Sequence, residues 1–176
     1  MLKYIKMLRI KHWIKNGIVF LPLFFGGKLF SDSFFKCCLG FLGFSLISSC
    51  VYIINDIFDV DKDRLHSEKC KRPIASGEIS IKKASVIAVV CGIAGMLCVV
   101  FNWKAVLILA VYLILNILYS SGLKNIPIAD VLILASGFVF RLILGSFITQ
   151  IEVSSWLCLT VIAASFYLGL GKRRGE

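Results

Sequence analysis

Long apolar segments alternate with short polar ones along most of the chain. Several of the apolar segments approach the roughly 20 residues that a helix needs to cross the hydrocarbon core of a bilayer. Backbone groups inside a bilayer must satisfy their own hydrogen bonds, so we expect every one of these segments to be helical. The pattern predicts an all-α protein, a polytopic transmembrane bundle of about six helices that forms one domain over residues 1–176. The apolar segments cover residues 17–30, 34–57, 82–101, 104–122, 128–149 and 155–171.

The first segment is the least regular of the six. Pro22, Gly26, Gly27 and Lys28 interrupt it, which favours a tilted or re-entrant shape. The basic N-terminus resembles that of a secretory signal, but no small-residue cleavage site follows the apolar run. We therefore expect an uncleaved first span.

Composition excludes a water-soluble globular domain. Hydrophobic residues make up 59% of the chain, whereas soluble domains are about half apolar. The net charge of +10 would suggest nucleic acid in a soluble protein, but in a membrane protein it first reports topology, and we expect no nucleic-acid partner. Most of the seven cysteines lie inside apolar runs without C-x-x-C spacing, which favours buried thiols over a metal site.

The basic residues gather in alternate polar segments. If the N-terminus is cytoplasmic, sixteen of the twenty Lys and Arg residues fall on the inner side and three on the outer side, while Arg141 lies within a span. Cytoplasmic segments of membrane proteins carry such an excess. The bias predicts a multi-pass protein of the cell (inner) membrane with a cytoplasmic N-terminus, and most of these cations are topology anchors. The inner cations are Lys3, Lys6, Arg9, Lys11, Lys15, Lys62, Arg64, Lys69, Lys71, Arg72, Lys82, Lys83, Lys124, Lys172, Arg173 and Arg174.

Acidic residues cluster at the cytoplasmic end of the second segment. If the helix continues there, Asp56, Asp59 and Asp63 share one face, with Asn55 at its edge, while Asp61 points elsewhere into solvent. Three carboxylates on one face repel each other unless a cation lies between them. Oxygen ligands suit Mg²⁺, which takes one or two carboxylates together with substrate phosphates. A solvated helix end neutralised by lysines is the alternative.

A basic loop follows these acids. Lys69, Lys71 and Arg72 would neutralise phosphate charge that a metal leaves uncovered. The acids and the loop together suggest a handle for a diphosphate.

A second group of polar residues lies at the cytoplasmic ends of the fourth and fifth segments. Tyr119, Lys124 and Asp130 are level with the acids, and Arg141 lies eleven residues beyond Asp130, about 16 Å deeper on the same helix face. A deep arginine is costly, so we expect it to face a polar cavity or an anion. Pairing with another protein group is the alternative, although no acid within the spans lies at that depth. Gly137 and Gly145 leave open space beside Arg141 or serve helix packing.

The first motif resembles a family signature, that of the UbiA-type intramembrane prenyltransferase superfamily. The resemblance implies an all-helical bundle with a central cavity, in which Mg²⁺ on this motif binds a diphosphate. It implies that Asp56, Asp59 and Asp63 are catalytic and that they hold the metal together with Asn55. The matching residues are Asn55-Asp56-x-x-Asp59-x-x-x-Asp63 and Arg72-Pro73-Ile74-x-x-Gly77.

The second motif departs from the common pattern. Most of the superfamily has a second D-x-x-x-D here, whereas this chain has only Asp130, with Asn125 and Ile126 where a partner acid would stand. The departure argues against the quinone, haem and chlorophyll branches. The chain is instead similar to the decaprenyl-phosphate phosphoribosyltransferase branch, through Lys15-Asn16, Tyr119-Ser120-x-x-Leu123-Lys124-x-x-Pro127-x-x-Asp130, Ser136-Gly137-Phe138-x-x-Arg141 and Lys172-Arg173-Arg174-x-Glu176.

That branch transfers phosphoribose from 5-phosphoribosyl-1-diphosphate to a polyprenyl phosphate. The resemblance implies these two substrates, Mg²⁺ as cofactor and the lipid bilayer as surroundings; a homo-oligomer is compatible with it. Family members continue for several helices beyond the Lys-Arg segment, so we expect this chain to lack the last ones. The expected substrate-binding residues are Lys15, Asn55, Lys69, Arg72, Tyr119, Lys124, Asp130, Arg141, Lys172 and Arg173.

Two other functions remain open at this point. One is prenyl transfer from a polyprenyl diphosphate to an aromatic or other acceptor. The other is a transporter or non-catalytic membrane subunit with an acid-lined vestibule. Transport favours ionisable groups near the bilayer midplane, whereas here the acids cluster at one end and only Arg141 is deep.

Overall fold

The computed structural model describes residues 2–29, 31–122 and 127–174. Every regular element in these ranges is a helix, which confirms the predicted all-α class. In chain order the elements are α1 (Leu2–Leu8), the 3₁₀ helix η1 (Ile10–Phe20), α2 (Leu21–Phe25), α3 (Ser33–Phe58), α4 (Val60–Leu65), the 3₁₀ turn η2 (Lys69–Lys71), α5 (Ile81–Leu97), α6 (Trp103–Ser121), α7 (Pro127–Thr149) and α8 (Ser155–Arg174).

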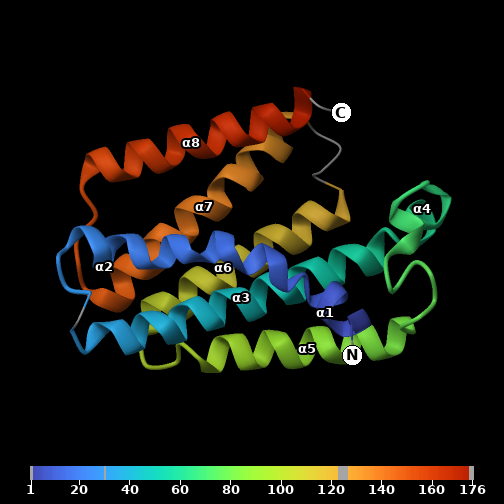
Figure 1. The fold of residues 1–176 in the computed structure, drawn as a ribbon, viewed down its shortest axis with the longest axis horizontal. Helices are drawn as coiled ribbons and strands as arrows, with labels where there is room; N and C mark the ends of the chain where they lie inside the picture. Colours follow the sequence, from blue (N-terminus) through green and yellow to red (C-terminus); the bar gives the residue numbers. More distant parts are fainter. Residues whose placement is uncertain (1, 30, 123–126, 175–176) are drawn as a thin grey trace.

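The structure bears on one of the two shapes predicted for the first apolar segment. The chain is helical on both sides of Pro22, because the ring occupies the first turn of α2, where no backbone N–H is needed. The break lies earlier, at Arg9, whose left-handed backbone (φ 51°, ψ 45°) separates α1 from η1. η1 and α2 then run from the α4 end of the molecule to the opposite end, so the segment is not re-entrant (Figure 1).

Three of the described helices are long and apolar enough to cross a membrane: α3, α6 and the part of α7 from Val131 to Thr149. The third and sixth predicted spans also form helices, α5 and α8. The chain is therefore a multi-pass membrane protein.

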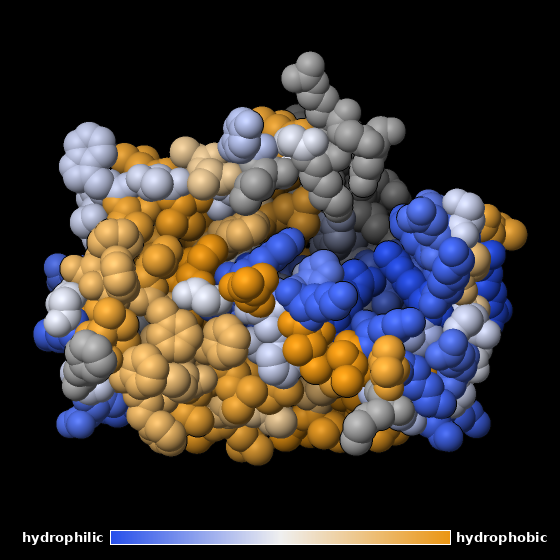
Figure 2. Space-filling model, in the orientation of Figure 1, coloured by the Kyte–Doolittle hydropathy of each residue, from blue (hydrophilic) through white to orange (hydrophobic). Residues whose placement is uncertain are grey.

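The ends of the bundle differ in polarity. α1, α4 and the last turns of α8 lie at one end, and the α2–α3, α5–α6 and α7–α8 connections lie at the other (Figure 1). Hydrophilic side chains gather over the α4 end of the molecule, and apolar side chains cover most of the remaining face in this view (Figure 2). This arrangement agrees with helices that cross in alternating directions.

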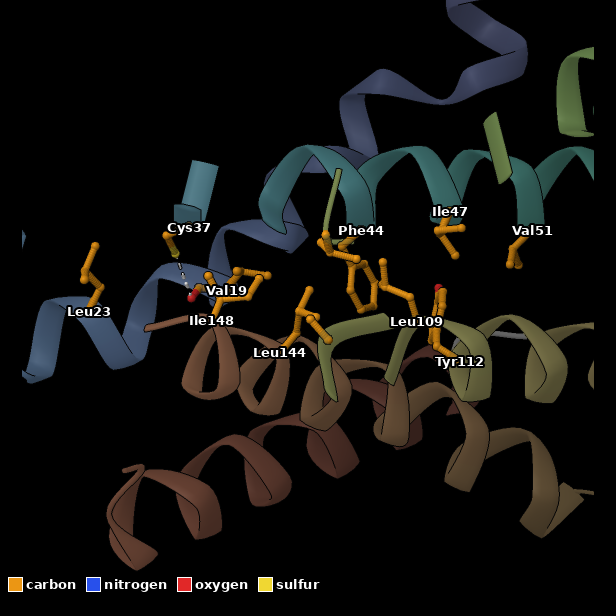
Figure 3. Packing of buried hydrophobic residues seen from close by; sticks show 12 residues of the cluster. Val19, Leu23, Cys37, Phe44, Ile47, Val51, Leu109, Tyr112, Leu144 and Ile148 are labelled. Carbon is orange, nitrogen blue, oxygen red and sulfur yellow. Dashed lines mark hydrogen bonds between the residues drawn. The ribbon is translucent and has the colours of Figure 1, made fainter. Parts of the chain in front are cut away.

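α3 is the central helix of the bundle. Its apolar residues Phe44, Ile47 and Val51 face α6 and α7 in a cluster that includes Tyr112 and Leu144 (Figure 3). On another side α3 packs against α5.

Glycines set the distance between helices at two of these contacts. A Cβ on Gly43 would lie 2.8 Å from the carbonyl oxygen of Gly95, so α3 and α5 meet backbone to backbone. A Cβ on Gly145 of α7 would overlap the carbonyl of Val19 in η1. Gly145 is therefore a packing position, which decides between the two alternatives predicted for it.

Candidate active site

The acid motif lies where α3 passes into α4. α3 ends at Phe58, and Asp59 (φ −97°, ψ 7°) forms a single-residue joint before α4 begins. The backbone N–H of Asp63 donates to the carbonyl of Asp59 at 2.8 Å, so the joint barely alters the helical spacing. Asp56 and Asp63 consequently stay on one side of the chain, as their spacing predicts.

Arg72 joins the two outer acids of the motif. Its Nη1 donates to Asp63 Oδ2 at 2.7 Å and to Asp56 Oδ1 at 3.1 Å. The side chains of Asp56 and Asp63 are buried, at 4% and 6% exposure, whereas the Arg72 side chain is 28% exposed. Buried carboxylates need such a partner, because an unpaired charge would be strongly destabilising there.

The residues that follow Arg72 explain its position. Pro73 holds the backbone of Arg72 in an extended conformation (ψ 142°), because a proline disfavours helix in the residue before it. Ile74 and Ile79, each 2% exposed, anchor the loop in an apolar cluster with Ile53. Gly77 reverses the chain between these anchors with φ +80°, a conformation that favours glycine. The Arg-Pro-Ile-x-x-Gly motif is thus a rigid bracket for one guanidinium group.

A second arginine completes the group. Arg9 Nη2 donates to Asp56 Oδ1 at 2.5 Å, and its guanidinium lies 4.6 Å from the centre of the Tyr52 ring. We call Arg9, Asp56, Asp63 and Arg72 the acid–arginine cluster. Partial burial, then the charges of Lys15 and Arg9, lower the pKa of His12, which packs edge-on against Tyr52.

Sequence reasoning treated Arg9 as a topology anchor and missed its contact with the motif. Arg9 and Asp56 are 47 residues apart, and Arg9 stands in a segment with four other cations. No local signal distinguishes it from them.

Arg141 is separate from the cluster. It is 6% exposed, its Nε donates to Asn16 Oδ1 at 2.7 Å, and its guanidinium lies 4.5 Å from the centre of the Phe44 ring. Phe44 precedes Asp56 by twelve residues, so Arg141 lies about 18 Å further along α3. Arg141 therefore lies well away from the acid–arginine cluster along the bundle. Asn16 is a polar partner that sequence analysis did not assign to Arg141.

Gly137 leaves room for the Arg141 guanidinium, as one of the two alternatives predicted. A Cβ on Gly137 would lie 3.1 Å from Arg141 Nη1 and 3.7 Å from the Tyr112 ring. The Asn16 amide nitrogen in turn donates to Ser45 Oγ at 2.9 Å. The two hydrogen bonds of Asn16 therefore link η1, α3 and α7.

The other predicted site residues are dispersed. Asn55 Oδ1 accepts a hydrogen bond from Ser120 Oγ at 3.2 Å, so it contacts α6 as well as neighbouring the acids in sequence. Lys15 and Lys69 are exposed, and Tyr119 is half-buried. Asp61, 90% exposed, pairs with Arg64 in solvent, as expected. Lys124 lies outside the described residues, and so do the side chains of Asp130, Lys172 and Arg173.

The cluster suits a divalent cation in part. Among the described residues, no three His, Cys, Asp or Glu side chains come close enough together to hold a metal ion. Two carboxylates nevertheless converge on one positively charged nitrogen, Arg72 Nη1. Two carboxylate oxygens with the remaining positions left to phosphate or water are what Mg²⁺ commonly takes. Asp56 and Asp63 fit that ion, and Asp59 lies between them in sequence.

The fold and this site define a helical membrane protein with a buried acid–arginine cluster at one end of its bundle. The chain belongs to the UbiA prenyltransferase family, which it matches over residues 18–171.

Two relatives and one solved structure illustrate the match. The Sinorhizobium fredii protein y4nM is 35% identical over 98% of this chain and 34% of that protein. Decaprenyl-phosphate phosphoribosyltransferase of Mycobacterium tuberculosis is 32% identical over 98% of this chain and 59% of the enzyme. A UbiA homologue from Archaeoglobus fulgidus bound to DMAPP and Mg²⁺ superposes with a TM-score of 0.76, at 25% identity, over 95% of this chain and 60% of that one. The chain thus spans at most about three fifths of these relatives.

Proposed function

We propose that the protein transfers 5-phosphoribose from 5-phosphoribosyl-1-diphosphate to a polyprenyl phosphate at the cytoplasmic membrane face and releases diphosphate. The observation that carries the proposal is the convergence of Asp56 and Asp63 on Arg72 at one end of a membrane bundle. The similarity to decaprenyl-phosphate phosphoribosyltransferases along nearly the whole chain supports this donor and acceptor over others.

The chemistry requires little from acid–base residues. An ionised phosphate oxygen of the lipid attacks C1 of the ribose, and the C1–O bond to the diphosphate breaks with its electron pair on the leaving group. Both oxyanions are ionised at pH 7, so no proton has to move. Mg²⁺, when bound, supplies positive charge to the leaving diphosphate.

The chain's own residues have separate tasks in this reaction. Asp56 and Asp63, with Asp59 and Asn55 beside them, hold the metal–diphosphate. Arg72, which the loop bracket fixes beside the acids, faces the phosphate charge that the metal does not cover. Lys15, Lys69, Tyr119, Lys124, Asp130, Lys172 and Arg173 remain proposed substrate contacts.

Prenyl transfer from a prenyl diphosphate is the second candidate. It is favoured by the fold neighbour bound to DMAPP and Mg²⁺ and by a Francisella tularensis 4-hydroxybenzoate octaprenyltransferase that is 32% identical over 65% of this chain. The shorter match makes it the weaker of the two.

One assay separates the candidates. The full chain in lipid nanodiscs is given Mg²⁺ and labelled 5-phosphoribosyl-1-diphosphate with decaprenyl phosphate, or labelled geranylgeranyl diphosphate with 4-hydroxybenzoate. We expect a new labelled product, labelled phosphoribosyl decaprenyl phosphate, only in the first reaction, and loss of it in Asp63→Asn but not in the exposed control Asp61→Asn. Product only in the second reaction would establish prenyl transfer instead.

A further inference from the structure

The charges of the acid–arginine cluster cancel without a metal. Two carboxylates face two guanidinium groups, and both guanidinium groups contact the same oxygen, Asp56 Oδ1. A divalent cation placed on these acids would leave the cluster with two excess positive charges. Either an arginine moves away from Asp56 or an anion enters with the metal.

The two arginines differ in how firmly they are held. Arg72 sits on a loop bracket that is fixed by Pro73 and buried isoleucines, and it contacts both acids. Of the two acids, Arg9 contacts only Asp56, and it stands at the joint between α1 and η1. Its φ of +51° is a backbone conformation that residues with a Cβ seldom adopt. The backbone at Arg9 is therefore strained while its side chain contacts Asp56.

The surroundings of Arg9 leave the joint anchored when that contact breaks. Met7, 1% exposed, packs into the apolar cluster at the α4 end. Ser49 Oγ donates to the carbonyl of Leu8 at 2.8 Å and accepts from Trp13 Nε1 at 3.1 Å. These contacts hold both sides of Arg9. Its guanidinium also lies over the face of Tyr52, a cation–π contact that is separate from the ion pair with Asp56.

We infer that Arg9 is an exchangeable counter-ion of Asp56: it occupies this carboxylate when the metal is absent, yields it to a divalent cation, and then turns to the incoming diphosphate. Arg9 is thus a positioning residue that couples metal entry to anion entry. The inference rests on the proposed function, since it takes the cluster to be the metal–diphosphate site.

The exchange predicts opposite effects on two ligands. Arg9→Gln and Arg9→Gly both remove the competing charge, and glycine also relieves the left-handed backbone. In the purified full chain without diphosphate, we expect both variants to bind Mn²⁺ alone about tenfold more tightly, measured from the EPR signal of free Mn²⁺. In the Mn²⁺-loaded protein, we expect both to bind inorganic diphosphate several-fold more weakly, measured by calorimetry.

Three variants serve as controls. Arg9→Lys keeps the charge and should bind Mn²⁺ nearly as the unmodified chain does. Lys11→Gln removes an exposed charge from the same segment and should change neither affinity. Asp63→Asn should abolish Mn²⁺ binding, which locates the metal in the cluster.

The outcomes distinguish the two claims. Unchanged or weaker Mn²⁺ binding in both Arg9→Gln and Arg9→Gly, with binding still lost in Asp63→Asn, overturns the exchange and leaves the proposed function standing. Different Mn²⁺ affinities for the Gln and Gly variants would show that backbone strain, not charge, sets the effect, and would also overturn it. Mn²⁺ binding that survives Asp63→Asn removes the metal from the cluster, and both proposals fail.

Discussion

Two neighbouring acids show how single residues acquire different tasks. Asp61 and Asp63 are two positions apart in α4, so they point to nearly opposite faces of the helix. The Asp61 side chain is 90% exposed and pairs with Arg64 in solvent, whereas that of Asp63 is 6% exposed and accepts from Arg72. The two residues are chemically identical, but the exposed Asp61 forms a surface ion pair, whereas the buried Asp63 belongs to the acid–arginine cluster.

Asp63→Asn should therefore destabilise the fold more than Asp61→Asn. The first change removes a charge-assisted hydrogen bond to Arg72 and should lower the free energy of unfolding by about 1.5–3 kcal/mol. The second removes a solvent-exposed pair and should change it by less than about 1 kcal/mol. Thermal unfolding in detergent compares them, and equal losses would mean that burial does not distinguish these acids.

Arg141 and Asn16 form another pair that can be tested residue by residue. Arg141→Ala removes the stacking on Phe44 and leaves the buried Asn16 oxygen without its donor. We expect a loss of about 2–4 kcal/mol in stability, and a coupling of about 1–3 kcal/mol in a double-mutant cycle with Asn16→Ala.

Arg141→Lys is the matched variant for this pair. It keeps the charge but not the planar fork, so a largely unrestored stability would assign the role to geometry rather than charge. A coupling near zero would contradict a structural pair and favour direct phosphate binding by Arg141.

At the scale of helices, α3 and α5 pack in close backbone contact. Without water to drive helices together, packing inside a bilayer depends on small residues that allow a short interhelical distance. Gly43 and Gly95 supply that contact: each would place a Cβ within 3 Å of the other's carbonyl oxygen. α5 is thereby held against α3, the helix that carries Asp56.

Two glycines of α5 give a matched test of this contact. Gly95→Ala should destabilise the protein by about 1–3 kcal/mol, because the added methyl overpacks the interface with α3. Gly92→Ala should be neutral or stabilising by up to about 1 kcal/mol, because its Cβ would meet only Cys50 Sγ, at 3.6 Å, and alanine favours helix. Detergent or thermal unfolding reads both, and an equal loss in both variants would refute the packing argument.

Hydropathy and spacing predicted most elements because bilayer length and helical period act locally. The second segment, predicted at 34–57, is α3 at Ser33–Phe58, and the fifth, predicted at 128–149, is α7 at Pro127–Thr149. The N-terminal region before and within the first segment was harder to predict, since no sequence feature marks the left-handed Arg9 or the long 3₁₀ stretch that follows it. Both depend on contacts with α3, such as Trp13 with Ser49.

The candidate site was predictable to the same extent. Asp56, Asp63 and Arg72 follow from helical spacing and from the Arg-Pro-Ile motif, and the structure brings them together. Asn55 contacts Ser120, and Arg9 contacts Asp56 from a segment 47 residues away. Both are tertiary contacts, which local sequence spacing does not predict. The burial of Arg141 was foreseeable from its depth, whereas its partner Asn16, 125 residues away, was not.

At the scale of the whole molecule, the acid–arginine cluster lies at the polar end of the bundle, where α4 carries Asp63 (Figure 2). α1, the loop that carries Cys70, and the end of α8 lie at this end, and the connections near Asn102 and Glu152 lie at the other (Figure 1). Loops rich in Lys and Arg stay in the cytoplasm. We therefore expect the acid–arginine cluster to face the cytoplasm, where phosphorylated substrates are available.

Cysteine labelling tests this orientation directly. In a chain whose other cysteines are replaced by alanine, Cys70 should resist a membrane-impermeant maleimide in intact cells and react after permeabilisation. In a matched chain that also lacks Cys70, Glu152→Cys should react in intact cells, because Glu152 is exposed at the opposite end. The difference follows from an excess of inner cations of sixteen to three, which makes the inverted topology unfavourable. Labelling of Cys70 but not of Glu152→Cys in intact cells would place the cluster on the outer face and would separate it from a cytoplasmic phosphoribosyl donor.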